Sequence, residues 1–156
     1  MHLLVPFSLL ALATATPIAP RAASDTSNDL TSTSGNSSCK AMTVIFARGT
    51  TESGNVGTLA GPPFFAALDS AVGAENVAVQ GVEYPANVQG FLAGGDATGS
   101  KTMVSLVQMA MTKCPSTKIV VAGYSQGGQL VHNAAVAMST AQTKAVTSGK
   151  LPKLQT

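Results

Sequence analysis

The stretch KIVVAGYSQGGQL, residues 118–130, joins a strand pattern to a helix pattern without a break. It begins with an apolar run rich in β-branched residues, which is typical of a buried parallel strand. A helix is expected to follow, from Gln126 to about Thr143. Between them stands Gly-x-Ser-x-Gly at residues 123–127, and a serine on a sharp turn between a strand and a helix is arranged as an exposed nucleophile. An ordinary glycine-rich turn is the alternative.

The neighbours of Ser125 suit the chemistry of acyl transfer. Gly123 and Gly127 have no side chains, so the strand and the helix can approach each other closely around the turn. The free amides and the positive dipole end of the helix favour the negative oxygen that develops in the reaction. We therefore predict Ser125 as the nucleophile and the backbone amide of Gln126 as an oxyanion donor.

Strand and helix patterns alternate along the rest of the chain. Strands are predicted at residues 42–47 and 76–82, and helices at residues 62–72, ending at Gly73, and 101–112. Glycine-rich loops are predicted at residues 49–61 and 90–99. This order predicts a parallel sheet with right-handed crossovers and helices on both faces, and the length allows one domain.

Composition excludes several classes of function. Apolar residues make up 45% of the 156 residues and charged residues only 10%, which is ample for a buried core. The net charge of +2, the absence of a basic run and the absence of tryptophan argue against nucleic acid or an acidic membrane surface as a partner. No metal-ligand cluster and no nucleotide fingerprint is present, so no cofactor is expected.

The first 38 residues predict secretion. An apolar run at residues 3–13 is followed by Ala13-Thr14-Ala15, so we expect a signal peptide at residues 1–15. Residues 16–38 are mostly polar and are expected to be a propeptide or a disordered arm, with order beginning at Cys39. Asn36 begins an N-glycosylation sequon.

The two cysteines support the same interpretation. Cys39 and Cys114 fit a secreted chain with one disulfide, for which there is a single connectivity. Two free buried thiols are the alternative.

Several separated segments resemble the fungal cutinases and their acetylxylan esterase relatives. In chain order they are residues 48–52 (RGTTE), 81–86 (GVEYPA), 112–115 (TKCP) and 123–128 (GYSQGG). The resemblance runs from Cys39 to about Ala141 and places the family's first disulfide at Cys39 and Cys114. It implies a three-layer α/β/α sandwich of the α/β-hydrolase type over residues 39–156, with a parallel sheet that is incomplete at the C-terminal side.

The resemblance also implies a reaction. Ser125 would attack an ester carbonyl and form an acyl-enzyme that water hydrolyses, with the Thr50 hydroxyl helping to form the oxyanion hole. A turn residue that only satisfies the local backbone is the alternative for Thr50. The implied substrate is cutin, a polyester, with an acetylated polysaccharide such as acetylxylan as the competing choice. The implied protein is an extracellular monomer.

The acid and the base of such a site are missing after Ser125. In α/β-hydrolases the serine is followed by Asp or Glu and then by His, but no acidic residue follows Ser125, and the only later histidine is His132. His132 lies roughly 10 Å along the predicted helix axis from the serine, so we interpret it as a packing or surface residue. Glu52, Glu83 and Asp96 have no histidine beside them in the sequence, and we expect Glu52 to be a structural partner of Arg48.

We expect the family's acid and base to lie beyond Thr156. The sheet would then have one uncovered edge. A secreted remnant that binds an ester polymer without turnover, and a truncated gene model, are the alternatives to an active esterase.

Overall fold

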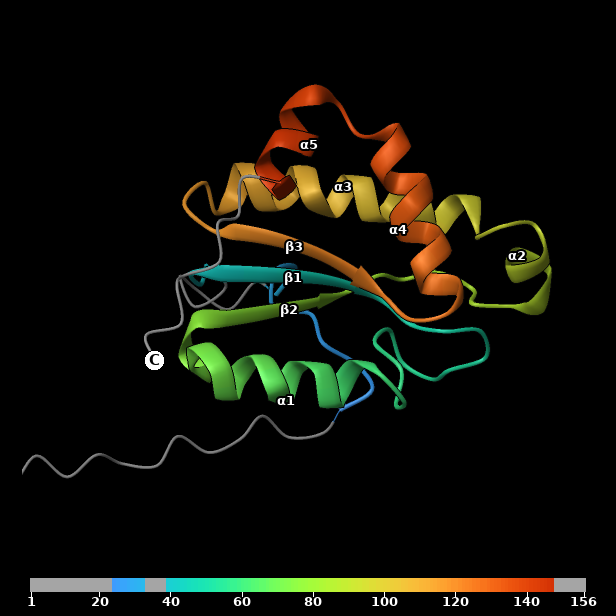
Figure 1. The fold of residues 1–156 in the computed structure, drawn as a ribbon, viewed down its shortest axis with the longest axis horizontal. Coiled ribbons are helices and arrows are strands. Elements are labelled where there is room, and N and C mark those ends of the chain that lie inside the picture. The colour runs from blue at the N-terminus through green and yellow to red at the C-terminus, as the bar shows by residue number, and fades with distance from the viewer. Residues whose placement is uncertain (1–23, 33–38, 148–156) are drawn as a thin grey trace, which may run out of the picture.

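Three parallel strands form the centre of the molecule, with helices on both faces (Figure 1). The computed structural model describes residues 24–32 and 39–147. The strand order is β2-β1-β3, and Met42 at the start of β1 lies opposite Val77 and Lys118. The elements of the described part are β1 (Met42–Ala47), α1 (Gly61–Val72), the 3-10 turn η2 (Ala74–Asn76), β2 (Val77–Gly81), α2 (Val88–Leu92), α3 (Ala97–Lys113), β3 (Lys118–Gly123), α4 (Gln126–Ala137) and α5 (Thr140–Thr147).

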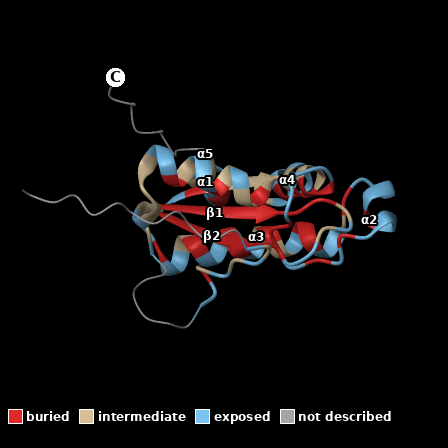
Figure 2. Ribbon diagram, turned by 90° about the horizontal axis from the view of Figure 1, so that it is seen from below, coloured by how far each residue is buried: buried red, intermediate tan, exposed pale blue. Residues whose placement is uncertain are grey.

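The two faces of β1 belong to two different cores. Val44 and Phe46 point to the α1 side, where Phe46 meets Phe65 edge to face with ring centroids 5.2 Å apart. Ile45 and Ala47 point to the side covered by α3 and α4. Since the central strand is buried along its whole length, it is uniformly red in Figure 2. The predicted three-layer α/β/α sandwich of the cutinase-like α/β-hydrolase type is confirmed.

One predicted helix is divided in two. The helix expected to run from Gln126 to about Thr143 ends at Ala137, and Met138 is extended with ψ 141°. Ser139 and Gln142 then form a capping box, in which the Gln142 side chain accepts from the Ser139 amide and the Ser139 hydroxyl accepts from the Gln142 amide. This box starts α5.

The disulfide between Cys39 and Cys114 is confirmed, with Cα atoms 5.3 Å apart. It joins the segment before β1 to the C-cap of α3. The expected alternative of two free thiols is therefore wrong.

Residues 24–32 lie along the outer edge of β2, so the expectation that order begins at Cys39 is wrong for this part of the arm. Asn28 forms an antiparallel bridge with Gln80, and Asp29 exchanges hydrogen bonds with Val79 through its own amide and carboxylate. Leu30 is wholly buried in the core on the α3 side. A mostly polar segment is ordered here because the unpaired backbone of an edge strand supplies its partners. Residues 1–23 and 33–38, including the expected signal peptide and Asn36, lie outside the described residues.

The opposite edge of the sheet is formed by β3. In the described part of the chain no strand pairs with its outer side, and residues 120–123 are only half-buried. No described helix is long and apolar enough to cross a membrane.

Candidate active site

Ser125 stands in the sharp turn between β3 and α4. Its backbone has φ 53° and ψ −117°, a conformation that costs energy in a residue with a side chain, and the residue is exposed. The flanking glycines are required by close contacts: a Cβ at Gly123 would lie 2.3 Å from the carbonyl of Gly127, and a Cβ at Gly127 would lie 2.0 Å from the Ala47 oxygen. The turn therefore presents the serine hydroxyl at the carboxyl end of the sheet and at the N-terminus of α4.

The side chain of Gln126 binds Thr50 and so holds it near the N-terminus of α4. This wholly buried side chain donates from Nε2 to Thr50 Oγ1 and to the Asn87 carbonyl, both at 2.9 Å. A hydroxyl that accepts a hydrogen bond in this way keeps its own hydrogen available to donate. A Cβ at position 90 would lie 2.7 Å from Gln126 Oε1, so Gly90 leaves the space that this side chain needs.

The loop that carries Thr50 is folded around the carboxylate of Glu52. That carboxylate accepts from the backbone amides of Gly49, Thr58 and Leu59, at 2.6 to 2.9 Å. Burial by itself raises the pKa of Glu52, but these three amides, helped by the Arg48 charge, outweigh it and hold the pKa below its ordinary value. The carboxylate thus stays charged and closes the loop.

Arg48 anchors the same loop to the next one. Its Nε donates to the main-chain carbonyl of Glu52 at 2.7 Å, and Nη2 donates to the Tyr84 carbonyl at 2.8 Å. The guanidinium lies 5.0 Å from the centre of the Tyr84 ring, and the Tyr84 hydroxyl donates back to the Arg48 carbonyl. Burial raises the pKa of Tyr84 to about 12, so this hydroxyl remains a donor. The predicted pairing of Glu52 with Arg48 takes place through the main chain of Glu52.

Apolar side chains are exposed near the serine. The short helix α2 begins at Asn87, whose carbonyl binds Gln126, and Gln129 of α4 donates to the Phe91 carbonyl. α2 therefore lies beside the start of α4, and it is largely exposed in Figure 2. The large exposed apolar residues of this region are Leu59, Val88, Phe91, Leu92 and Tyr124.

The other residues considered in the sequence do not join the site. His132 is exposed on α4 and makes no hydrogen bond to Ser125 in the described structure. Asp96 caps α3 by accepting from the Gly99 amide, and Glu83 accepts from Asn55. No described side chain therefore takes the position of a base beside Ser125.

Two features of the site were missed in the sequence. One is the side chain of Gln126, of which only the amide was considered, and the other is Asn55, a wholly buried polar residue. A Gly-Asn pair in a glycine-rich loop indicates a turn, but nothing in the sequence indicates that its side chain is buried.

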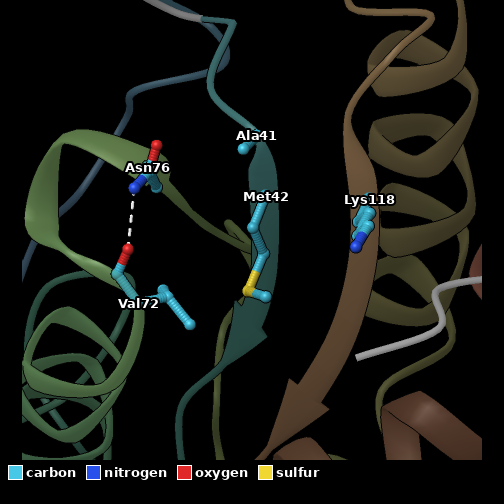
Figure 3. Close-up of a pocket in the computed structure, with 5 residues that line it drawn as sticks. All are labelled: Ala41, Met42, Val72, Asn76 and Lys118. Carbon is cyan, nitrogen blue, oxygen red and sulfur yellow. Dashed lines mark hydrogen bonds between the residues drawn. The ribbon is translucent and has the colours of Figure 1, made fainter. Parts of the chain in front are cut away.

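The cavity drawn in Figure 3 lies away from Ser125. Its volume is about 240 Å³, and it lies at the amino ends of β1 and β3, where its lining comes from Ala41, Met42, Val72, Asn76 and Lys118. Because Ser125 follows the carboxyl end of β3, this cavity is at the opposite end of the sheet.

Known proteins are similar to this chain in sequence. A family model described as Cutinase matches residues 38–151. The chain is 56% identical over 110 residues to the cutinase of Botryotinia fuckeliana, an alignment that covers 70% of this chain and 54% of that protein. It is 53% identical over 120 residues to cutinase pbc1 of Pyrenopeziza brassicae, covering 77% of this chain and 58% of that one.

Solved structures agree with the sequence comparison. Trichoderma reesei cutinase in complex with a phosphonate inhibitor matches with a TM-score of 0.70 and 42% identity, covering 80% of this chain and 53% of that one. An acetyl xylan esterase matches with a TM-score of 0.54 and 30% identity, covering 70% and 59%. The chain spans between half and two thirds of the length of these relatives, and it belongs to the cutinase family.

Proposed function

We propose that the protein is a secreted carboxylic ester hydrolase in which Ser125 is the nucleophile. The observation that carries this proposal is the backbone of Ser125, which holds an exposed hydroxyl at φ 53° on the turn between β3 and α4. Strain of this kind persists where the surrounding structure enforces it and is concentrated at reactive sites. The contacts of Gly123 and Gly127 are what enforce it here.

The proposed oxyanion donors are the backbone amide of Gln126 and the hydroxyl of Thr50. Attack by Ser125 on an ester carbonyl would place negative charge on the carbonyl oxygen, at the N-terminus of α4. The Gln126 side chain supports Thr50 as a donor, because it donates to Thr50 Oγ1 and leaves the hydroxyl hydrogen free for the oxyanion. The ester C–O bond then breaks, and the alcohol leaves with the proton that the serine hydroxyl has given up. Water hydrolyses the acyl-enzyme, which releases the carboxylic acid and restores the Ser125 hydroxyl.

Cutin is the proposed substrate. The exposed apolar residues of α2, which is hydrogen-bonded to the start of α4, and the exposed ring of Tyr124 offer an acyl chain a surface near the serine. A small acetyl group needs no such surface. Acetylated xylan is the second candidate, because an acetyl xylan esterase shares the fold.

The described site lacks a group that would activate Ser125. No described side chain takes the place of a base, and a serine without its base is a poor nucleophile. Sites that have lost triad members retain roughly 10³–10⁴-fold acceleration over water, so we expect slow turnover from this chain.

Hydrolysis of p-nitrophenyl butyrate tests the proposal. The full chain should release p-nitrophenol slowly, Ser125→Ala should abolish this release, and Ser70→Ala, on the exposed side of α1, should not change it. Release that is unaffected by Ser125→Ala would exclude Ser125 as the nucleophile. If the chain turns over, release of hydroxy fatty acids from cutin supports the cutinase assignment, whereas deacetylation of xylan alone supports the second candidate.

Secretion is proposed from the disulfide and from the predicted signal peptide at residues 1–15. A disulfide is typical of extracellular proteins. Sequencing the N-terminus of the protein collected from culture medium tests this, since a chain that still begins at Met1 would contradict it.

A further inference from the structure

Asn55 connects three separate segments through one buried side chain. Its Oδ1 accepts from the Ser27 amide at 2.9 Å. Its Nδ2 donates to Asn28 Oδ1 at 2.8 Å and to Glu83 Oε1 at 2.9 Å. The wholly buried amide therefore joins the N-terminal arm, the loop after β1 and the loop after β2.

The backbone beside Asn55 is held by the arm as well. The Asp25 carbonyl accepts from the amides of both Asn55 and Val56 at 2.9 Å. Gly54 has φ 63°, and a Cβ there would lie 1.9 Å from the Asp25 oxygen. At Gly81, a Cβ would lie 2.0 Å from Asn55 Oδ1. At both glycines the absence of a side chain therefore allows the close contact, with Asp25 in one case and with the Asn55 side chain in the other.

The loop that ends at Asn55 and Val56 is the loop that carries Thr50. On its other side it is held by Glu52 and Arg48, and at its tip the Thr51 amide donates to the Ala86 carbonyl at 2.7 Å. The arm is also tied to α3, because Lys113 Nζ donates to the carbonyls of Leu30 and Ser32. A displacement of the arm would therefore reach the Thr50 loop through Asn55.

We propose that Asn55 is a positioning residue that uses the described part of the arm, residues 24–32, to hold the Thr50 loop in place for catalysis. The role of Thr50 rests on the proposed function, whereas the coupling of arm and loop does not. A displacement of an angstrom in a group that contacts the reacting atoms can cost about a hundredfold in rate. The arm is then part of the working protein, and any removal of a leader must cut before Asp25.

Regional hydrogen exchange in the full chain tests the coupling. In Asn28→Ala and Asn55→Asp we expect exchange at residues 49–59 to become roughly tenfold faster, as for the loss of a buried hydrogen bond. Asn28 is exposed, so its replacement should not unfold the protein. The substitution Asn55→Asp would place a new carboxylate against that of Glu83. The matched control is Gln142→Ala, which removes a buried amide bound to the Val104 carbonyl and to Ser139 instead.

A second substitution separates positioning from simple loss of stability. In Asn55→Asp/Glu83→Gln the donor and the acceptor are exchanged, so the hydrogen bond between positions 55 and 83 can form again. We expect protection at residues 49–59 to return at least in part, while exchange in β3, which lies on the far side of β1 from the arm, stays as in the wild type throughout. Equal acceleration in β3 and in the loop, or no change in the loop, would overturn the proposal.

The kinetics of ester hydrolysis test the proposed function independently of hydrogen exchange. If the chain hydrolyses esters through Ser125, Asn55→Asp should lower kcat more than it raises KM, and Glu83→Gln should restore part of kcat. If loop exchange responds as expected and Ser125→Ala leaves hydrolysis unchanged, the proposed function fails while the coupling stands. If kcat is unchanged although the loop has loosened, the positioning role is overturned and the esterase remains.

Discussion

The two edges of the sheet differ in how their backbone is covered. Along the outer edge of β2, the arm supplies hydrogen bonds to Val79, Gln80 and Gly81. Along the outer edge of β3, no strand of the described part provides such partners, and residues 119–123 carry no charge that would prevent pairing with another chain. One edge is closed by polar contacts, and the other is open and apolar.

This difference divides the candidate site as well. Thr50 and its loop are tied to the closed side through Asn55 and Arg48. Ser125 follows β3, the open side, and is held chiefly by the local turn of Gly123 and Gly127. Thr50 thus depends on side-chain contacts with distant loops, whereas the position of the nucleophile depends on the backbone of its own turn and on the close approach of that turn to Ala47 at the end of β1.

The largest expected effect comes from opening the closed edge. Leu30→Ala removes a wholly buried side chain and should lower the free energy of unfolding by about 3 kcal/mol in urea denaturation. Leu92→Ala is the matched control, because Leu92 is 77% exposed and its loss should cost little. Equal stability of the two variants would show that the arm adds nothing to the fold.

The adjacent glycines Gly127 and Gly128 test the turn that carries the nucleophile. Gly127→Ala should destabilise the protein by about 2 kcal/mol, because its Cβ would meet the Ala47 carbonyl. Gly128→Ala should instead stabilise the protein by about 0.5–1 kcal/mol, since it lies in α4 and a Cβ there would have its nearest neighbour 3.9 Å away. Thermal unfolding of both variants checks this, and a shift of the same sign in both would contradict the described turn.

The pH dependence of stability tests the loop on the closed side. The folded pKa of Glu52 is lowered, so its contribution is complete above its ordinary value of 4.5 and is lost as the pH falls through the folded pKa. Urea denaturation between pH 7 and pH 3 should show less loss in Glu52→Gln than in the wild type. Identical pH profiles would mean that the carboxylate does not hold the loop in solution.

A small change in stability is also expected from a charge at the outer edge of β3. Val120→Lys should cost about 1 kcal/mol and reduce self-association, because a lysine on an edge strand opposes pairing with another chain. Light scattering checks this against Val120→Thr, which adds no charge. If the two variants associate equally, the open edge is not the surface through which chains associate.

Most of the strands and helices were predictable, because runs of β-branched residues indicate the strands and turn residues indicate where elements end. β1 has the predicted bounds, β2 is one residue shorter at each end than predicted, and α1 ends before Gly73 as expected. The break between α4 and α5 had a signal in Ser139 and Gln142, but the apolar spacing favoured a single helix. The arm and α2 had weak sequence patterns, because neither has a periodic apolar face. The arm is held by hydrogen bonds to β2, and α2 is held by its N-cap, Asn87.

The Ser125 turn was easier to predict from the sequence than the Thr50 loop. The turn at Ser125 could be predicted from its motif, because the glycines that permit this turn are neighbours of the serine in the sequence. Thr50 was identified only by resemblance. The side chains of Gln126 and Asn55 were not predictable, because their partners are separated from them by 27 to 76 residues along the chain.

Covalent labelling of Ser125 by a phosphonate probe tests the central claim most directly. The T. reesei relative is solved in complex with a phosphonate inhibitor, and such probes modify a serine without the need for turnover. Peptide mapping of the folded chain by mass spectrometry should find a single adduct, at Ser125, that is absent from Ser125→Ala and forms much more slowly in urea. An adduct at another residue, or equal labelling of Ser125 in the folded and unfolded chains, would show that the fold does not make this serine a nucleophile.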